Sequence, residues 1–294
     1  LGLRLVTGDG RVLDLGGRVV KNVAGYDLVR LATGSRGTLG LITRLHLRLR
    51  PLPEHDETLA WRAAEPGPLV DLAAWIREER IGVAAVELVG GGAAGVGGVG
   101  AGGPGEAAAS GAWGDGAWML LVRLQGNAEA VEAMRARLAE VVTAVTPVRL
   151  ADGAPRGSPD APSAPSSVAA AVWPALSALE ARAGLCVRLA DLPSRLPETL
   201  RAARELAGPL PDAVVLAHAG AGIVRVCAGG ARGAKSGATK AWSTPDLDRL
   251  AEHIAEHRER LAAQGGTVVI ARGSRELAER IDPWHPPADA ALRL

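Results

Sequence analysis

The chain has 294 residues, 48% of them hydrophobic, which is enough to fill one large core or two modest ones. Its 33 Lys and Arg residues nearly balance 32 Asp and Glu residues, so the overall charge gives no field that would attract nucleic acid. Apolar stretches are broken by Gly, Arg or Pro before they could span a bilayer, and Cys186 and Cys227 lack the spacing of a zinc site. We therefore expect a globular cytoplasmic protein without a membrane span, a metal or a nucleic-acid partner.

The first fifty residues begin with a hairpin and end with a strand. The segment LRLVTGDGRVLDL predicts two short strands around the turn at residues 8–10. The run ITRLHLRLR at 42–50 alternates apolar and basic residues, which predicts a half-buried strand that Pro51 and Pro53 end. Because the hairpin would open in the middle of a sheet, we expect the sequence to be truncated at its front.

The remaining residues alternate strands and helices in two similar series. The first series comprises a strand at 57–63, a helix at 68–80, strands at 83–89 and 118–124, and a helix from Asn127 to about Val142. The second comprises a helix at 175–182, a strand at 185–189, a helix at 193–206, paired strands at 213–220 and 222–228, a helix from Thr244 to Gln264 and a strand at 265–271. Segments near 90–112, 151–167 and 228–243 are rich in Gly, Ala, Ser or Pro, which indicates flexible loops.

Residues 17–51, GRVVKNVAGYDLVRLATGSRGTLGLITRLHLRLRP, combine glycines with neutral hydrogen-bonding side chains. The glycines let a ligand approach the backbone closely and use its N–H groups, and Asn22, Ser35 and Thr38 add uncharged hydrogen bonds. This chemistry suits a dinucleotide, although a structural connection rich in turns has the same composition.

The order KNVAGYDL, a short helix, GSRGTLGLIT and a strand resembles the second subdomain of the FAD-binding domain in the p-cresol-methylhydroxylase and vanillyl-alcohol-oxidase flavoproteins, above all the glycolate-oxidase type. The resemblance implies an α+β fold in which residues 1–51 are the second half of a PCMH-type FAD-binding domain and residues 52–294 are a cap built of two ferredoxin-like halves. It also implies the residues that line the flavin. They are Asn22, Gly25, Tyr26, Gly34, Ser35, Gly37, Thr38, Gly40, Ile42 and Thr43.

The resemblance leaves the role of Asp27 open, and the family's pattern is incomplete at both ends of this sequence. Asp27 either caps the helix that begins at Leu28 or contacts the cofactor. The first flavin subdomain would precede Leu1, and a C-terminal tail would follow the segment IDPWHPP, so we expect truncation at both ends.

A cap strand in related D subunits and D-lactate dehydrogenases reads His-x-Gly-Asp-Gly-Asn-x-His and helps build a metal and hydroxy-acid site. Here the corresponding run is HAGAGIVR, from His218 to Arg225, which leaves one ligand where a divalent metal needs several. We therefore expect no metal and no catalytic residue in this chain. His218 is interpreted as a satisfied core or interface histidine, and Arg225 as a solvated strand arginine with carboxylate binding as the alternative.

His253 and His257 are spaced to share one face of a helix, which could in principle hold a metal. The pattern is not HExxH, and the segment is dense in Glu and Arg. We therefore expect both to lie on a solvated, charged helix face.

The resemblance implies an FAD-linked oxidoreductase subunit of a glycolate oxidase complex, which oxidises glycolate or a similar 2-hydroxy acid by hydride transfer to the flavin. It implies a second flavin subunit of D type and an iron–sulfur subunit as partners, in the cytoplasm or held at a membrane through those partners. Two alternatives stay open. One is a structural subunit that keeps the fold without flavin, and the other is a superfamily member that acts on a different alcohol or amine.

Overall fold

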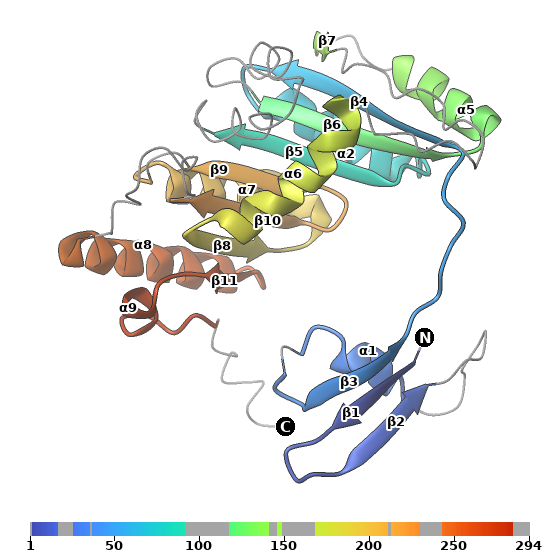
Figure 1. The fold of residues 1–294 in the computed structure, drawn as a ribbon. Coiled ribbons are helices and arrows are strands. Elements are labelled where there is room, and N and C mark those ends of the chain that lie inside the picture. Colours follow the sequence, from blue (N-terminus) through green and yellow to red (C-terminus); the bar gives the residue numbers. More distant parts are fainter. Residues whose placement is uncertain are drawn as a thin grey trace, which may run out of the picture. The chain divides into compact units, whose positions relative to one another are not determined.

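The chain divides into two compact units, Leu1–Leu52 and Pro53–Leu294 (Figure 1). The computed structural model describes residues 2–16, 26–35, 37–91, 118–140, 146–148, 168–210, 213–229 and 243–284. The loops expected near 90–112, 151–167 and 228–243 fall almost entirely outside these ranges. Among the helices of the described ranges, none has the length and apolar character needed to cross a membrane.

The first unit is a small antiparallel sheet with one short helix. Its strands lie in the order β2-β1-β3, with β1 at Gly2–Val6, β2 at Val12–Gly16 and β3 at Leu41–His46, and α1 spans Leu28–Ala32. The predicted hairpin is confirmed, because β1 and β2 pair with Val6 opposite Val12. Leu3, Leu5 and Ala32 form the buried core of this unit.

Much of the apolar surface of the first unit is not covered by the residues of this unit that the structure describes. Eleven of the thirteen exposed large hydrophobic side chains in the described part of the chain belong to it. The strand predicted at 42–50 ends at His46, and it is not half-buried, since Leu45 is 57% exposed. The reason is that α1 has only five residues and packs on the side of β2, which leaves β3 bare.

The second unit is an eight-stranded sheet formed by two βαββαβ halves. The first half consists of β4 (His55–Ala63), α2 (Gly67–Glu78), β5 (Ala85–Gly91), β6 (Trp118–Gly126), α5 (Ala128–Ala139) and β7 (Thr146–Val148). The second half consists of β8 (Leu185–Ala190), α7 (Leu196–Ala207), β9 (Val214–His218), β10 (Ile223–Ala228), α8 (Thr244–Ala262) and β11 (Thr267–Arg272). Helix α6 (Val168–Arg182) precedes the second half, and α9 (Arg275–Ala278) follows it.

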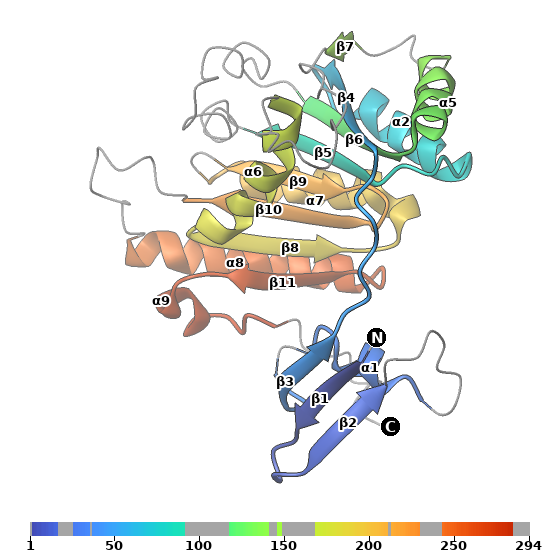
Figure 2. The ribbon, with the colours of Figure 1, turned by 45° about the vertical axis from the view of Figure 1, so that its right-hand side comes forward.

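The strand order repeats in the two halves. It is β7-β4-β6-β5 in the first and β11-β8-β10-β9 in the second, so each half has its last strand outermost and its first strand next to it. The halves join where β5 pairs with β9, as Figure 2 shows. This order is that of a ferredoxin-like fold, and the prediction of two such halves is confirmed.

Helices cover the two faces of this sheet unequally. Apolar residues of α2, α5, α7 and α8 pack in one large cluster against one face. Val172 and Leu176 of α6 pack in a second cluster against the other face, where α6 crosses the strands (Figures 1 and 2). Among the described helices, α6 therefore covers only part of this face, which also carries the polar residues considered below.

Local signals in the sequence set the helix ends. The side chain of Asn127 accepts a hydrogen bond from the N–H of Ala130 at 2.9 Å, so its predicted role as the N-cap of α5 is confirmed. The helix ends at Ala139, before the predicted Val142.

Candidate functional site

The glycine-bearing loop between α1 and β3 is open on its outer side. Gly34 and Gly37 have φ angles of +81° and +83°, a conformation that favours glycine, and a Cβ placed on either would meet nothing within 4 Å. Within the described residues, the N–H groups of both glycines make no backbone hydrogen bond. The loop therefore offers accessible donors to a ligand or to water.

Ser35 and Thr38 hold the shape of this loop. The carbonyl of Ser35 accepts hydrogen bonds from the N–H of Thr38 at 3.0 Å and from its hydroxyl at 2.7 Å. Because these bonds use both donors of Thr38, its hydroxyl oxygen can serve a ligand only as an acceptor.

Three other expected site residues lie at the start of β3. A Cβ on Gly40 would lie 2.5 Å from the carbonyl oxygen of Val6, so the close approach of β1 already requires glycine there. Ile42 and Thr43 are exposed, and the hydroxyl of Thr43 makes only a long contact of 3.5 Å with the carbonyl of Arg4. Both side chains are free to contact a ligand.

The residues before α1 are only partly described. Asn22 and Gly25 lie outside the described residues, and Tyr26 is 95% exposed. Asp27 is the N-cap of α1, since its side chain accepts from the N–H of Arg30 at 2.9 Å. The structure thus brings the expected residues from Gly34 to Thr43 together in one loop and strand, with α1 between them and Tyr26.

The first unit has a strong positive charge that does not show in the net charge of the whole chain. Residues 1–52 contain nine Lys or Arg and three Asp or Glu, a net charge of +6, whereas the rest of the chain carries −5. A basic surface attracts an anionic ligand such as the pyrophosphate of a dinucleotide. Counting charges separately on either side of Pro51 and Pro53 would have found it.

A row of polar side chains lies on the α6 side of the larger sheet. Glu87, His218 and Arg225 each lie two positions along a strand from a residue that packs under α6, so they point to the same face. His218 Nδ1 lies 2.6 Å from Glu87 Oε1, and Arg225 Nε lies 3.5 Å from Glu180 Oε2. His218 is thus satisfied, but Arg225 is half-buried and paired, so the prediction of a solvated arginine is wrong.

The contact with Glu87 raises the pKa of His218, because the carboxylate favours the protonated ring. A raised pKa in the folded state makes the pair stabilising below the unfolded histidine pKa of about 6.5, and this contribution is lost as pH rises through the higher folded value. We expect Glu87→Gln to lower the His218 pKa toward its ordinary value in an NMR titration, and to reduce stability more at pH 6 than at pH 9.

The control for this prediction is Glu57→Gln. Glu57 pairs with Arg135, which stays protonated throughout this range, so its effect should not change between pH 6 and pH 9. An equal pH profile for the two variants would contradict the assigned ion pair of His218.

His253 and His257 do not share a solvated face. His257 is only 1% exposed, its Nδ1 lies 2.8 Å from the carbonyl of His253, and its Nε2 has no hydrogen-bond partner among the described residues. Burial lowers the pKa of His257. The prediction failed because this side of α8 packs against α7, where Glu205 lies 3.6 Å from Nε2. In the described part of the chain, no cluster of three or more His, Cys, Asp or Glu side chains could hold a metal.

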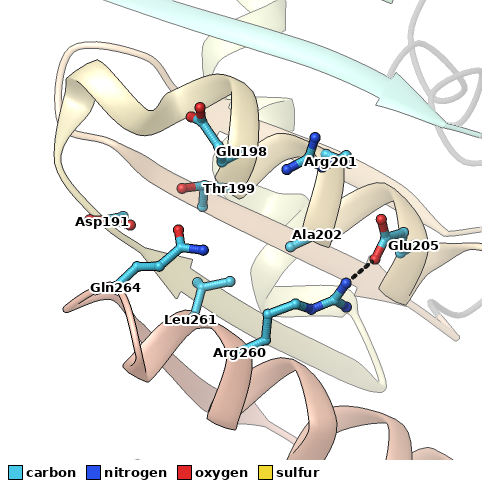
Figure 3. Close-up of a pocket in the computed structure, with 9 residues that line it drawn as sticks. All are labelled: Asp191, Glu198, Thr199, Arg201, Ala202, Glu205, Arg260, Leu261 and Gln264. Carbon is cyan, nitrogen blue, oxygen red and sulfur yellow. Dashed lines mark ion pairs between the residues drawn. The ribbon is translucent and has the colours of Figure 1, made fainter.

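A shallow pocket lies between α7 and α8 (Figure 3). Its lining residues are Asp191, Glu198, Thr199, Arg201, Ala202, Glu205, Arg260, Leu261 and Gln264. The ion pair of Arg260 with Glu205, at 2.9 Å, spans the two helices that form its walls. Five of the nine lining residues are charged, whereas small-molecule sites are mainly apolar, so this pocket does not compete with the glycine-bearing loop as a cofactor site.

Comparison with known sequences gives several partial matches. No family model matches the chain. The chain is 41% identical over 75 residues to glycolate oxidase subunit GlcE of Escherichia coli, a match that covers 26% of this chain and 21% of that protein. It is 48% identical over 59 residues to subunit GlcD of Bacillus subtilis, a match that covers 20% of this chain and 13% of that protein. It is 37% identical over 89 residues to the mitochondrial D-lactate dehydrogenase [cytochrome] of Arabidopsis thaliana, a match that covers 30% of this chain and 16% of that protein. The matched regions thus span about a fifth or less of the length of each of these relatives.

Comparison with solved structures covers nearly the whole chain. A p-cresol methylhydroxylase with bound substrate matches with a TM-score of 0.59 at 14% identity, over 99% of this chain and 60% of that one. The 4-ethylphenol oxidase of Gulosibacter chungangensis matches with a TM-score of 0.54 at 16% identity, over 95% of this chain and 58% of that one. These structures show the fold that the sequence predicted, the second part of a PCMH-type FAD-binding domain followed by an α+β cap.

Proposed function

We propose, from its similarity to the glycolate oxidase subunits GlcE and GlcD, that this chain is a member of the FAD-linked oxidase superfamily and an FAD-dependent oxidoreductase subunit acting on glycolate or a similar 2-hydroxy acid. The observation that carries the proposal is the open, glycine-bearing loop from Gly34 to Gly40 on a unit with a net charge of +6. Such a loop presents backbone donors where a dinucleotide can lie against them, and the basic unit attracts its phosphates.

The residues of the first unit would bind and orient the cofactor. The N–H groups of Gly34 and Gly37 would donate hydrogen bonds to it, and the hydroxyl oxygen of Thr38 would accept one. The exposed ring of Tyr26 and side chain of Ile42 supply apolar surface for a flat ring system. When bound, FAD supplies the acceptor for the hydride that leaves the hydroxyl-bearing carbon of the substrate.

The substrate and the partners are the finer part of the proposal. Oxidation of a 2-hydroxy acid to a 2-oxo acid removes a hydride from carbon and a proton from the hydroxyl. We assign the substrate site to a second flavin subunit of D type and onward electron transfer to an iron–sulfur subunit, in a cytoplasmic complex. Sequence similarity to two differently named glycolate oxidase subunits, GlcE and GlcD, supports a complex with more than one flavin-type chain.

The test begins with the full-length protein purified without its partners. We expect flavin absorption bands and release of FAD on denaturation. The reconstituted complex is expected to reduce a dye when glycolate is added. Absence of bound flavin at saturating FAD would overturn the cofactor assignment, and flavin without glycolate-dependent reduction would overturn the substrate alone.

A second candidate is a structural subunit that keeps the fold without flavin. It is favoured by the run from His218 to Arg225, in which Ala221, Ile223 and Arg225 stand where relatives of D type carry polar ligands, and by the pairing of His218 with Glu87. A colourless full-length protein that is still required for activity of the complex would establish this candidate.

A further inference from the structure

The two cysteines of the chain meet inside the larger sheet, although 40 residues separate them in sequence. Cys186 of β8 and Cys227 of β10 are directly opposite one another in the antiparallel pair. Their Sγ atoms are 3.5 Å apart and hydrogen-bonded. The separation of the two cysteines in the sequence gives no sign of this contact, because it depends on the pairing of β8 with β10.

The backbone at this position can accommodate a disulfide. Residues that face each other in antiparallel strands have Cα atoms about 4.5 to 5.5 Å apart, and disulfides form at Cα separations of about 4.4 to 6.8 Å. Closure therefore requires rotation of the two side chains and no movement of β8 relative to β10.

We propose that Cys186 and Cys227 form an oxidisable dithiol, a modification site that closes into a cross-strand disulfide when a peroxide reaches it. The proposal does not depend on the flavin or on the substrate.

The chemistry of closure is balanced with hydrogen peroxide as the oxidant. The thiolate of Cys227 attacks one peroxide oxygen, which breaks the O–O bond and gives a sulfenic acid and, after proton uptake, water. The sulfur of Cys186 then attacks the sulfenic sulfur, the S–S bond forms, and the hydroxyl leaves as a second water with the proton of Cys186. Each sulfur is oxidised by one electron, and the peroxide takes up both electrons.

The surroundings assign the two thiols different roles. Cys227 is slightly exposed, whereas Cys186 is completely buried, so an oxidant that enters reaches the sulfur of Cys227 first. Cys227 is therefore the attacking sulfur and Cys186 the resolving one.

Burial determines which oxidants can act. Cys186 is 0% exposed and Cys227 is 4% exposed, and both lie in the cluster that Val172 and Leu176 of α6 cover. A small oxidant such as hydrogen peroxide can enter during local opening of α6, whereas a bulky disulfide reagent is excluded from the folded protein.

The experiment treats the folded full chain with hydrogen peroxide, unfolds it, and counts the thiols that react with N-ethylmaleimide. Because the chain has only two cysteines, the count is unambiguous. We expect two labels before oxidation and none after it, a mass loss of two hydrogen atoms, full recovery with dithiothreitol, and one cross-linked peptide that contains both cysteines.

The matched controls are Cys186→Ala and Cys227→Ala, since a buried serine would lack a hydrogen-bond partner. Cys186→Ala is expected to give a sulfenic acid at Cys227 that dimedone traps, and Cys227→Ala is expected to stay unmodified. Two free thiols after treatment, linkage between chains, or over-oxidation without the internal cross-link would overturn the proposal. If either variant fails to fold, the label count on the unchanged chain still decides.

Discussion

Gly37→Leu is expected to weaken FAD binding by the full-length protein by at least about tenfold, which corresponds to roughly 1.4 kcal/mol. A Cβ on Gly37 would project into open space, so the added side chain would occupy the volume in which we propose that the cofactor lies. The dissociation constant, measured by fluorescence quenching of FAD, provides the test.

Gly10 offers a matched control for this change. Its φ of +82° equals that of Gly37 within a degree, and a Cβ there would also meet nothing within 4 Å, but it lies in the hairpin between β1 and β2. Gly10→Leu therefore carries the same backbone strain of about 1 to 2 kcal/mol without obstructing the loop. Equal loss of FAD affinity in the two variants would show that unit stability is affected, and the loop assignment would be wrong.

The repeated βαββαβ order was predictable because its elements follow simple physical rules. A continuous apolar run from Trp118 to Val122 marked β6, and a single apolar stripe marked α2, while Asn127 supplied a helix start. Strand β7 was missed, since it has three residues and contains Pro147, which disfavours a strand prediction. Only the pairing of β4 with β7 reveals that the first half is complete.

Contacts between distant residues set the limits of sequence-based prediction at the candidate sites. Nothing in the spacing of Glu87 and His218 shows that β5 and β9 pair with these two residues opposite each other. The same holds for His257, whose burial depends on the packing of α8 against α7. The composition of the loop from Gly34 to Gly40, by contrast, follows directly from local backbone requirements, so its open geometry could be anticipated.

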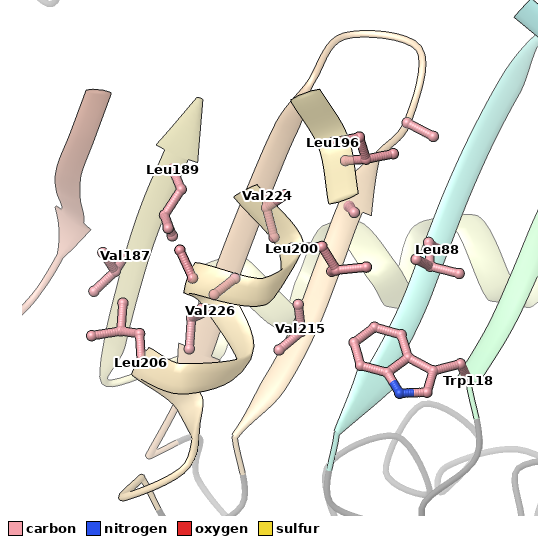
Figure 4. Packing of buried hydrophobic residues seen from close by; sticks show 14 of the residues in the cluster. Leu88, Trp118, Val187, Leu189, Leu196, Leu200, Leu206, Val215, Val224 and Val226 are labelled. Atoms are coloured by element: carbon pink, nitrogen blue, oxygen red, sulfur yellow. The ribbon is translucent and has the colours of Figure 1, made fainter. Parts of the chain in front are cut away.

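Gly90→Ala is expected to lower the free energy of unfolding by about 3 kcal/mol, the upper part of the range for overpacked cores. Gly90 lies near the end of β5, and a Cβ there would overlap the indole ring of Trp118 on β6. Trp118 is 5% exposed and lies beside Leu88 and Leu200 in the core between the sheet and α7 (Figure 4), so the ring has little room to move. Urea unfolding followed by circular dichroism measures the effect.

Two further variants separate this contact from a general intolerance of alanine. Gly82 has an ordinary φ and open space around a Cβ, so Gly82→Ala is expected to change stability by less than about 0.5 kcal/mol. In the double variant Gly90→Ala/Trp118→Leu, the smaller side chain relieves the overlap, and the total loss should fall below the sum of the two single losses by about 1 kcal/mol or more. Additive losses, or a Gly90→Ala protein as stable as Gly82→Ala, would mean that Trp118 does not lie against β5. The packing of the first half of the sheet against α7 would then have to be reassigned.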